Sequence, residues 1–221
     1  MRYEIKFLLN DLELVEFKSW IISETRFKKK YETRIVNSIY FDDIYHSSAN
    51  DNLAGISLRE KYRLRWYNNE FNKIAKLELK KKINKLNYKE FFDFEPIKKN
   101  PTNMSNKEYA NICHKMLMNW NSKYIFELFP KIQVQYTREY YQDIKNTRLT
   151  IDNKIKFWKS VDNEKMFYGN HLDYEFNIAE IKFPPNLYRH VSKLLKNTRF
   201  IPKRHSKYLI GLALFDEFKY F

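Results

Sequence analysis

The stretch KYRLRW, residues 61–66, alternates cationic with large apolar side chains. In a β-strand, successive side chains point to opposite faces, so the stretch predicts a strand with three cations on one face and three apolar side chains on the other. Like charges on neighbouring positions of one face repel each other. The three cations therefore need either open water or a bound polyanion beside them.

A division into an ionic and an apolar face recurs in other predicted strands. The ionic positions are Glu4 with Lys6, Glu78 with Lys80 and Lys82, Glu180 with Lys182, Arg138, and Arg148 with Asp152. An ordinary amphipathic sheet with one face in water explains any single strand. A closed antiparallel barrel explains the whole set better, because solvated faces usually include Thr, Ser and Gln, whereas these faces concentrate Arg, Lys and a few Glu. A charged interior of this kind would repel itself unless a chain of phosphates normally occupies it.

The pattern along the chain predicts roughly eight strands, among nine candidate segments, and about four helices. We expect strands over 2–9, 36–42, 61–66, 73–82, 87–94, 131–141, 147–155, near 166–169 and over 172–183, and helices over 11–26, 105–120, 186–196 and 206–218. Asn10 or Asp11 can cap the first helix, whose apolar positions include Leu12, Val15, Trp20 and Ile22. Ser105 and Glu108 have capping-box spacing. The order predicts an α+β fold: a closed antiparallel β-barrel whose apolar exterior is covered by helices, in a single domain over residues 1–221.

The composition favours a folded domain with an anionic partner. Of 221 residues, 43% are hydrophobic, which is enough for a sizeable core. Lys and Arg total 41 against 27 Asp and Glu, a net charge of +14. Such a charge suits nucleic acid, an acidic membrane surface or a phosphorylated small molecule, with a solvated Lys-rich surface as the plain alternative.

Several classes of protein are excluded by what the sequence lacks. Cys113 is the single cysteine, so neither an intramolecular disulfide nor a cysteine-cluster zinc site can form. The three glycines are far apart, which excludes a P-loop and a dinucleotide-binding fingerprint. The longest apolar stretch, YLIGLALF, is too short to span a bilayer, and the first residues have no apolar core of signal-peptide length. Any bound phosphates must therefore be held mainly by side chains.

The few carboxylates on the cationic faces need a reason, because a carboxylate repels phosphate. A divalent cation supplies one, since Mg²⁺ or Mn²⁺ is typically held by one or two carboxylates together with substrate phosphate oxygens. Glu180, Glu78 and Glu4 are the candidates in that order. For Glu4 and Glu78, a salt bridge that spaces the cations is an equal alternative.

Nine segments, taken in order, resemble the VTC polyphosphate polymerase domain of the triphosphate tunnel metalloenzyme (CYTH-like) superfamily. They are RYEIKFLL, SIYFD, KYRLRWY, LELKKK, YKEFF, YTREYY, RLTID, AEIKF and SKY. The resemblance runs over nearly the whole chain. It implies an antiparallel barrel whose basic tunnel binds a nucleoside triphosphate and the growing polyphosphate.

The same resemblance implies roles for particular residues. The positions that match phosphate-binding cations are Lys6, Arg63, Arg65, Lys80, Lys89, Arg138, Arg148, Lys182 and Lys207. Tyr136 and Ser206 match polar tunnel positions, and Glu180 matches the carboxylate that holds the metal. We expect Arg63, Arg65, Lys80 and Glu180 to act in catalysis. CYTH-type triphosphatases begin with a Glu-x-Glu-x-Lys strand, but Arg2 stands here in place of the first Glu, which favours the polymerase branch.

The leading hypothesis is transfer of the γ-phosphoryl group of ATP to polyphosphate, with Mn²⁺ or Mg²⁺ as cofactor. Such a transfer needs positioning and charge neutralisation more than a protein nucleophile. One rival is a triphosphate or polyphosphate hydrolase with Glu78 or Glu4 as the base. Another is a basic module for RNA or single-stranded DNA, which is disfavoured because the aromatic side chains should face away from the cations. The family implies a membrane-protein partner, and we expect a cytoplasmic location, with the inner face of a membrane as the alternative.

Overall fold

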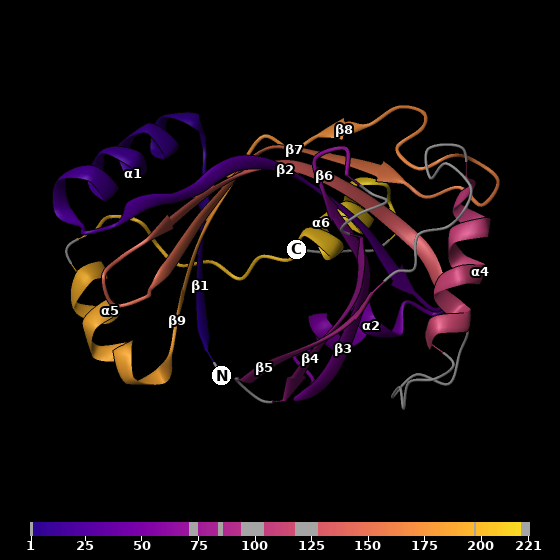
Figure 1. The fold of residues 1–221 in the computed structure, drawn as a ribbon, viewed down its shortest axis with the longest axis horizontal. Helices are drawn as coiled ribbons and strands as arrows, with labels where there is room; N and C mark the ends of the chain where they lie inside the picture. Colours follow the sequence, from indigo (N-terminus) through magenta and orange to yellow (C-terminus); the bar gives the residue numbers. More distant parts are fainter. Residues whose placement is uncertain are drawn as a thin grey trace. The chain divides into compact units, whose positions relative to one another are not determined.

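The computed structural model describes residues 2–70, 75–83, 86–93, 104–117, 128–196 and 198–217. The strands among them are β1 (Tyr3–Leu9), β2 (Lys28–Asp42), β3 (Leu58–Tyr67), β4 (Lys76–Ile83), β5 (Leu86–Asp93), β6 (Phe129–Gln142), β7 (Arg148–Lys159), β8 (Leu172–Asp173) and β9 (Asn177–Phe183). The helices are α1 (Asp11–Glu24), α2 (Ser47–Leu53), α4 (Asn106–Leu117), α5 (Tyr188–Leu195) and α6 (Lys207–Leu214), with a 3₁₀ turn, η2, at Pro185–Leu187 (Figure 1).

These nine described strands form one large antiparallel sheet, which confirms the α+β prediction. The strand order is β1-β9-β7-β6-β2-β3-β4-β5, and β8 pairs with β7. The predicted hairpin of β3 and β4 is present, with Lys61 opposite Lys80. Within the described residues the order starts at β1 and ends at β5, so the predicted closure into a barrel is not shown.

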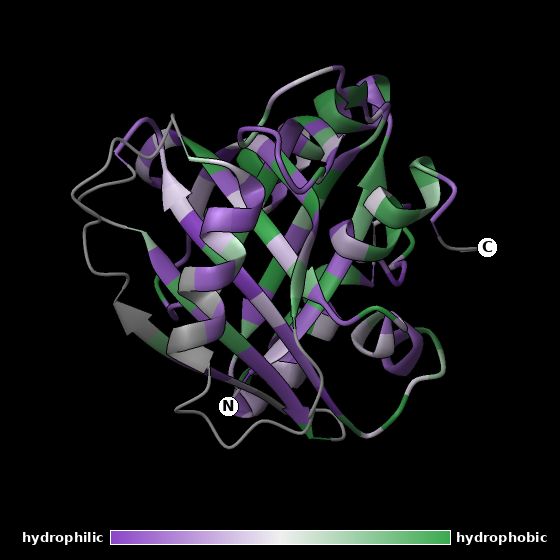
Figure 2. Ribbon diagram, turned by 90° about the vertical axis from the view of Figure 1, so that its right-hand side faces the viewer, coloured by the Kyte–Doolittle hydropathy of each residue, from purple (hydrophilic) through white to green (hydrophobic). Residues whose placement is uncertain are grey.

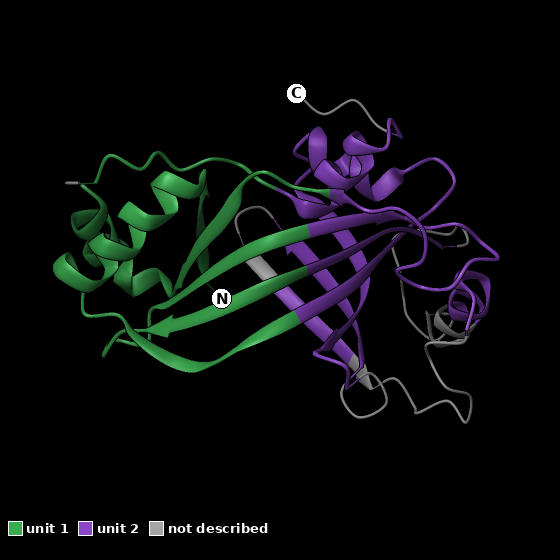
Figure 3. Cartoon of the chain, turned by 90° about the horizontal axis from the view of Figure 1, so that it is seen from above, with its two compact units in different colours: residues 1–35, 136–155, 173–205 green, residues 36–135, 156–172, 206–221 purple. Residues whose placement is uncertain are grey.

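The chain forms two compact units, each assembled from three separate segments (Figure 3). Unit 1 contains residues 1–35, 136–155 and 173–205, and unit 2 contains residues 36–135, 156–172 and 206–221. Strands β2, β6 and β7 contribute residues to both units. The single-domain assignment over residues 1–221 stays a prediction.

The core of unit 2 confirms the predicted apolar face of the KYRLRW strand. Tyr62, Leu64 and Trp66 are at most 6% exposed and belong to one cluster with Leu77 of β4 and Tyr109 of α4. Bands of polar and apolar residues alternate along the strands in Figure 2, as this division requires. The apolar half of KYRLRW therefore packs under a helix, and the cationic half occupies the opposite face of the sheet.

The core of unit 1 repeats this arrangement on other strands. Phe7, Ile151 and Ile181, from β1, β7 and β9, are buried together with Phe17 of α1 and Val191 of α5. Figure 1 shows α1 and α5 beside these strands. Helices thus cover the apolar strand faces of this unit too.

Helix α1 begins as predicted but buries different residues. Asn10 is its N-cap and forms a capping box with Glu13. The buried side chains are Phe17 and Ile21, whereas three of the apolar positions named from the sequence point away from the sheet. The helix is apolar on most sides, so its periodicity could not show which side is buried.

Other elements agree with the predictions or correct them. Ser105 and Glu108 form the expected capping box, with Glu108 N donating to Ser105 Oγ at 3.2 Å. Strand β2 begins at Lys28, eight residues before the predicted start at Val36. The prediction of a strand near residues 166–169 is wrong. Phe167 and Gly169 have φ values of +55° and +77°, which are found in turns rather than in strands.

Candidate functional site

Strands β3 and β4 of unit 2 present a strongly cationic face. The register places Arg59 opposite Lys82, Lys61 opposite Lys80, Arg63 opposite Glu78 and Arg65 opposite Lys76. Lys80 also lies opposite Lys89 of β5. Seven cations and one carboxylate therefore share the face of β3 and β4, and three lysines, Lys61, Lys80 and Lys89, occupy a single cross-strand row. Like charges placed directly opposite one another are destabilising.

This cationic face of unit 2 is not simply immersed in water. Arg65 is 5% exposed, the side chain of Arg63 is 14% exposed, and that of Lys89 is 30% exposed. Lys61, Lys80 and Lys82 are half-buried, while Lys76 is exposed. Burial makes positive charge more costly, so water alone does not account for the cations of KYRLRW, and polar or anionic partners are needed beside them.

Glu78 forms an ion pair in the middle of this face. Its Oε2 accepts a hydrogen bond from Arg63 Nε at 2.6 Å and lies 3.6 Å from Lys89 Nζ. Burial alone would raise the pKa of Glu78, but the charges of Arg63, Arg65 and Lys89 outweigh it and hold the pKa well below its usual range. A carboxylate of low pKa is a poor general base. The geometry matches the salt-bridge alternative stated for Glu78, and its metal-binding role stays a prediction.

Tyr40 of β2 lies on the same face and was missed by the sequence reasoning. It is the register partner of Arg63, and Ser38 is the partner of Arg65. Arg65 Nε donates to Ser38 Oγ at 3.0 Å. Burial would raise the pKa of Tyr40, but Arg63, Arg65 and Lys207 outweigh it, so the pKa is lowered. The alternation of SIYFD was the available signal, because it places Ser38 and Tyr40 on one side of the strand.

Tyr40 should therefore report on anions bound to this face. In a spectrophotometric titration we expect one tyrosine to ionise below the ordinary tyrosine range, and Tyr40→Phe should remove that transition. Bound tripolyphosphate neutralises the neighbouring cations, so it should raise the pKa of this tyrosine. The control is Tyr168→Phe, which removes an exposed tyrosine. If the pH of this low tyrosine transition did not change when tripolyphosphate was added, phosphate binding beside Tyr40 would be contradicted.

The SKY segment adds two predicted residues to the unit 2 face. Ser206 is the N-cap of α6, and its Oγ accepts a hydrogen bond from Lys61 Nζ at 3.0 Å. Lys207 lies near enough to Tyr40 to lower its pKa. Tyr208 stacks on Tyr40 at a centroid distance of 5.4 Å. Lys61 therefore contacts a residue of the candidate site.

A second ionic face lies in unit 1, on β1, β9 and β7. One cross-strand row contains Glu4, Lys182 and Arg148, and the next contains Lys6, Glu180 and Thr150. The Glu180 carboxylate lies 2.9 Å from Lys182 Nζ and 3.8 Å from Lys6 Nζ. Lys6 Nζ also donates to the carbonyl oxygen of His205 at 2.9 Å. Arg148 is exposed at the start of β7.

Arg138 and Asp152 form a buried ion pair in unit 1. Arg138 Nε and Nη2 donate to the two carboxylate oxygens of Asp152 at 2.5 and 2.7 Å. The guanidinium also lies over the Tyr136 ring, 5.1 Å from its centroid. Burial would lower the pKa of Arg138, but Asp152 outweighs it and raises the pKa well above its usual value. Asp152 thus partners Arg138 across strands, rather than Arg148 on its own strand.

Neutralising Asp152 should destabilise the protein. In Asp152→Asn, the buried guanidinium of Arg138 loses its anion, and we expect the free energy of unfolding to fall by about 3 to 5 kcal/mol. Urea denaturation measures the change. The double variant Arg138→Met with Asp152→Leu should recover most of the loss, because it removes both charges. A loss below about 1 kcal/mol for Asp152→Asn would contradict a buried ion pair.

The surroundings of Glu180 fit a divalent cation that shares its ligands with a substrate. Thr150, the cross-strand neighbour of Glu180, has a buried hydroxyl oxygen without a hydrogen-bond partner. Carboxylate and hydroxyl oxygens suit Mg²⁺ or Mn²⁺. In the described part of the chain, no group of three or more His, Cys, Asp or Glu could hold a metal by itself. Phosphate oxygens would therefore have to complete the ligand shell.

The predicted site residues divide between the two units. Unit 2 contains Arg63, Arg65, Glu78, Lys80, Lys89, Ser206 and Lys207, and unit 1 contains Glu4, Lys6, Tyr136, Arg138, Arg148, Glu180 and Lys182. Within each unit the register brings most of these residues onto one strand face. Tyr40 and Thr150 join them although the sequence reasoning named neither as a site residue.

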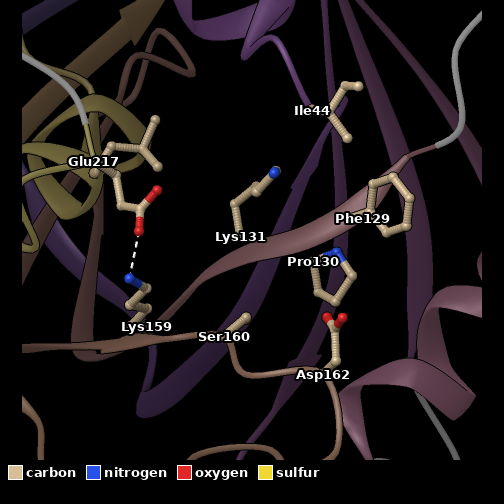
Figure 4. Close-up of a pocket in the computed structure, with 9 residues that line it drawn as sticks. Ile44, Phe129, Pro130, Lys131, Lys159, Ser160, Asp162 and Glu217 are labelled. Carbon is tan, nitrogen blue, oxygen red and sulfur yellow. Dashed lines mark ion pairs between the residues drawn. The ribbon is translucent and has the colours of Figure 1, made fainter.

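A separate pocket of about 300 Å³ lies in unit 2 (Figure 4). Its lining includes Ile44, Phe129, Lys131, Asp162 and an ion pair between Lys159 and Glu217. None of the predicted phosphate-binding residues lines it. The pocket is therefore distinct from the cationic strand face.

A family model described as the VTC domain matches residues 1–216. The chain belongs to the VTC domain family. No curated protein matches this VTC domain by sequence. In the described residues, no helix is long and apolar enough to cross a membrane.

Solved structures share the fold of this VTC domain at low sequence identity. The PH1819 protein from Pyrococcus horikoshii has a TM-score of 0.52 and 15% identity over 98% of this chain and 99% of its own. A putative adenylyl cyclase from Hippeastrum, described as having a dominant triphosphatase activity, has a TM-score of 0.50 and 16% identity over 96% of each chain. A putative adenylate cyclase from Vibrio parahaemolyticus has a TM-score of 0.53 and 11% identity over 96% of this chain and 98% of its own. This VTC domain therefore shares its fold with these three proteins.

Proposed function

We propose that this VTC domain is a polyphosphate polymerase that transfers the γ-phosphoryl group of ATP to the end of an inorganic polyphosphate chain. The proposal includes closure of the sheet into a tunnel, as expected for the family, with the cationic faces turned inward. It also includes a cytoplasmic location beside a membrane-protein partner.

One observation carries the proposal: the half-buried face of β3 and β4 holds seven cations and one carboxylate. A chain of phosphates offers many regularly spaced negative charges, which suits rows of cations on successive strand positions. The row of Lys61, Lys80 and Lys89 places like charges opposite one another on three strands, and a bound anion would offset their mutual repulsion. A small ligand with one negative charge would offset only a small part of this positive charge.

Different types of side chain would have different roles in the reaction. Arg63 and Arg65 have planar guanidinium groups that can hold phosphate oxygens through two parallel hydrogen bonds. Lys80 and Lys89 would contribute point charges along the acceptor chain. Glu180 and the Thr150 hydroxyl would hold a divalent metal, which when bound supplies positive charge to the phosphate oxygens. The terminal oxygen of polyphosphate is already ionised at neutral pH, so no protein base is needed.

Hydrolysis of triphosphate or polyphosphate at the same site is the alternative. It is favoured by the dominant triphosphatase activity described for the Hippeastrum protein. A hydrolase needs an activated water, and Glu78, which pairs with Arg63 and has a lowered pKa, is poorly suited to activate one. Arg2 in place of the first Glu of the triphosphatase strand also favours the polymerase.

A nucleic-acid module is less well supported. Single-stranded nucleic acids need exposed aromatic side chains on which bases stack beside the cations. Tyr62 and Trp66 are instead buried on the opposite face of their strand, and Tyr40 on the cationic face is buried too. Phe91 of β5, which lies opposite Glu78 and near Lys89, is exposed, but one ring offers a single position for stacking.

Product analysis separates these possibilities. Incubation with ATP and Mn²⁺ should yield a ladder of polyphosphate chains that lengthens with time, resolved on a gel. Release of free phosphate without longer chains would contradict the polymerase and support the hydrolase. Binding of RNA without any ATP turnover would contradict both enzymes.

A further inference from the structure

Helix α1 exposes a stripe of large aliphatic side chains on the side away from its sheet. Leu12, Val15 and Ile22 are 80%, 65% and 82% exposed, whereas Phe17 and Ile21 are buried. The spacing of three and seven residues places the exposed three on one side of the helix, opposite Phe17. Exposed aliphatic side chains that line up on one element indicate a contact surface rather than random scatter.

A cationic segment follows α1 directly. Residues 26–35, RFKKKYETRI, contain five cations and one carboxylate, and every residue from 28 to 35 is exposed although the segment is part of β2. Lys18 of α1 bonds Glu139 at 2.7 Å, and Lys29 also lowers the pKa of Glu139. The start of β2 therefore lies beside one flank of α1.

A second cationic segment packs on the other flank of α1. In residues 199–204, RFIPKR, the Phe200 ring lies 5.0 Å from Phe17 and 6.4 Å from Trp20, between ring centroids. Arg199 forms an ion pair with Glu16. This packing leaves Ile201 74% exposed, next to the exposed Lys203 and Arg204. Exposed aliphatic and cationic side chains thus adjoin each other on both flanks of the helix.

We propose that this surface of unit 1, made of the α1 stripe with residues 26–35 and 199–204, docks on an anionic phospholipid bilayer. The aliphatic side chains enter the boundary between headgroups and acyl chains, and the flanking cations lie against lipid phosphates. Charge complementarity selects an anionic surface, and the aliphatic side chains distinguish a bilayer from a soluble polyanion. Polyphosphate or RNA offers no apolar phase for Leu12, Val15, Ile22 or Ile201. The proposal does not depend on the reaction proposed above.

Vesicle co-sedimentation tests the docking surface. The full chain should bind vesicles of phosphatidylcholine mixed with phosphatidylglycerol and should bind pure phosphatidylcholine weakly. Val15→Gln with Ile22→Gln should weaken binding about tenfold, because two aliphatic side chains no longer insert. Changing Lys28, Lys29 and Lys30 to Ser should weaken it about fivefold for each charge removed. Matched controls are Ile144→Gln, which alters another exposed isoleucine of unit 1, and Lys193→Ser with Lys196→Ser on and just after α5.

The outcomes are distinct. Loss of vesicle binding in both sets of surface variants, with the controls unchanged, supports a membrane-docking surface. Binding that survives Val15→Gln with Ile22→Gln and is removed by soluble polyphosphate shows a general polyanion surface and overturns the proposal. Equal losses in the control variants show attraction by net charge alone and also overturn it. ATP turnover in solution should be unchanged in the surface variants, so failure of this proposal leaves the polymerase proposal intact.

Discussion

Glu180→Gln should reduce polyphosphate synthesis roughly a hundredfold to a thousandfold, which is the size of effect seen when one group that stabilises transition-state charge is removed. Gln is nearly isosteric but lacks the negative charge that, in the proposed function, would hold a divalent cation beside Thr150. Lys6 and Lys182 would remain and would no longer be neutralised by the carboxylate. Binding of tripolyphosphate without metal should therefore be as tight or tighter, while its enhancement by Mn²⁺ disappears.

Calorimetric titration of tripolyphosphate with and without Mn²⁺ separates these effects from misfolding. Glu175→Gln is the matched control, because Glu175 is exposed in the same unit. If the Glu180→Gln protein is folded and retains both Mn²⁺-enhanced binding and full synthesis, Glu180 is not a metal ligand.

Arg65→Ala should reduce turnover about a hundredfold, whereas Lys61→Ala should reduce it only severalfold. Arg65 is 5% exposed and held by Ser38, so its guanidinium is fixed in one place on the cationic face. Lys61 shares a row with Lys80 and Lys89, which can supply charge in its absence. Steady-state kinetics of both variants with ATP and a short polyphosphate primer measures the difference.

The comparison also needs a check on folding, because Arg65 is buried. Thermal unfolding should show both variants folded at the assay temperature, and Arg65→Lys should recover less than half of the lost activity, since Lys lacks the planar fork. Equal effects of Arg65→Ala and Lys61→Ala would contradict the arrangement of phosphates along this face.

The strand faces could be predicted from the sequence because a strand has a period of two. KYRLRW separates large apolar from cationic side chains at every step, and the burial of Tyr62, Leu64 and Trp66 follows directly. The capping boxes could also be predicted, because each depends on two residues three positions apart in the sequence, Asn10 with Glu13 and Ser105 with Glu108.

Features that depend on register between strands could not be predicted. Tyr40 meets Arg63, and Arg138 meets Asp152, only because two distant segments pair in one particular alignment. A shift of one residue would turn the side chains to the other face. The first eight residues of β2 were not predicted, because they do not alternate between apolar and polar side chains. The exposed side of α1 was not predicted, because apolar residues occur on nearly every side of that helix.

The central claim is that the cationic strand faces hold the phosphates of ATP, and a crystal structure with a nonhydrolysable ATP analogue and Mn²⁺ tests it most directly. We expect phosphate oxygens within hydrogen-bonding distance of Arg63 and Arg65, and Mn²⁺ bound by Glu180. A triphosphate bound elsewhere, for example in the pocket beside Lys131 and Lys159, with these side chains still paired only to protein groups, would contradict it.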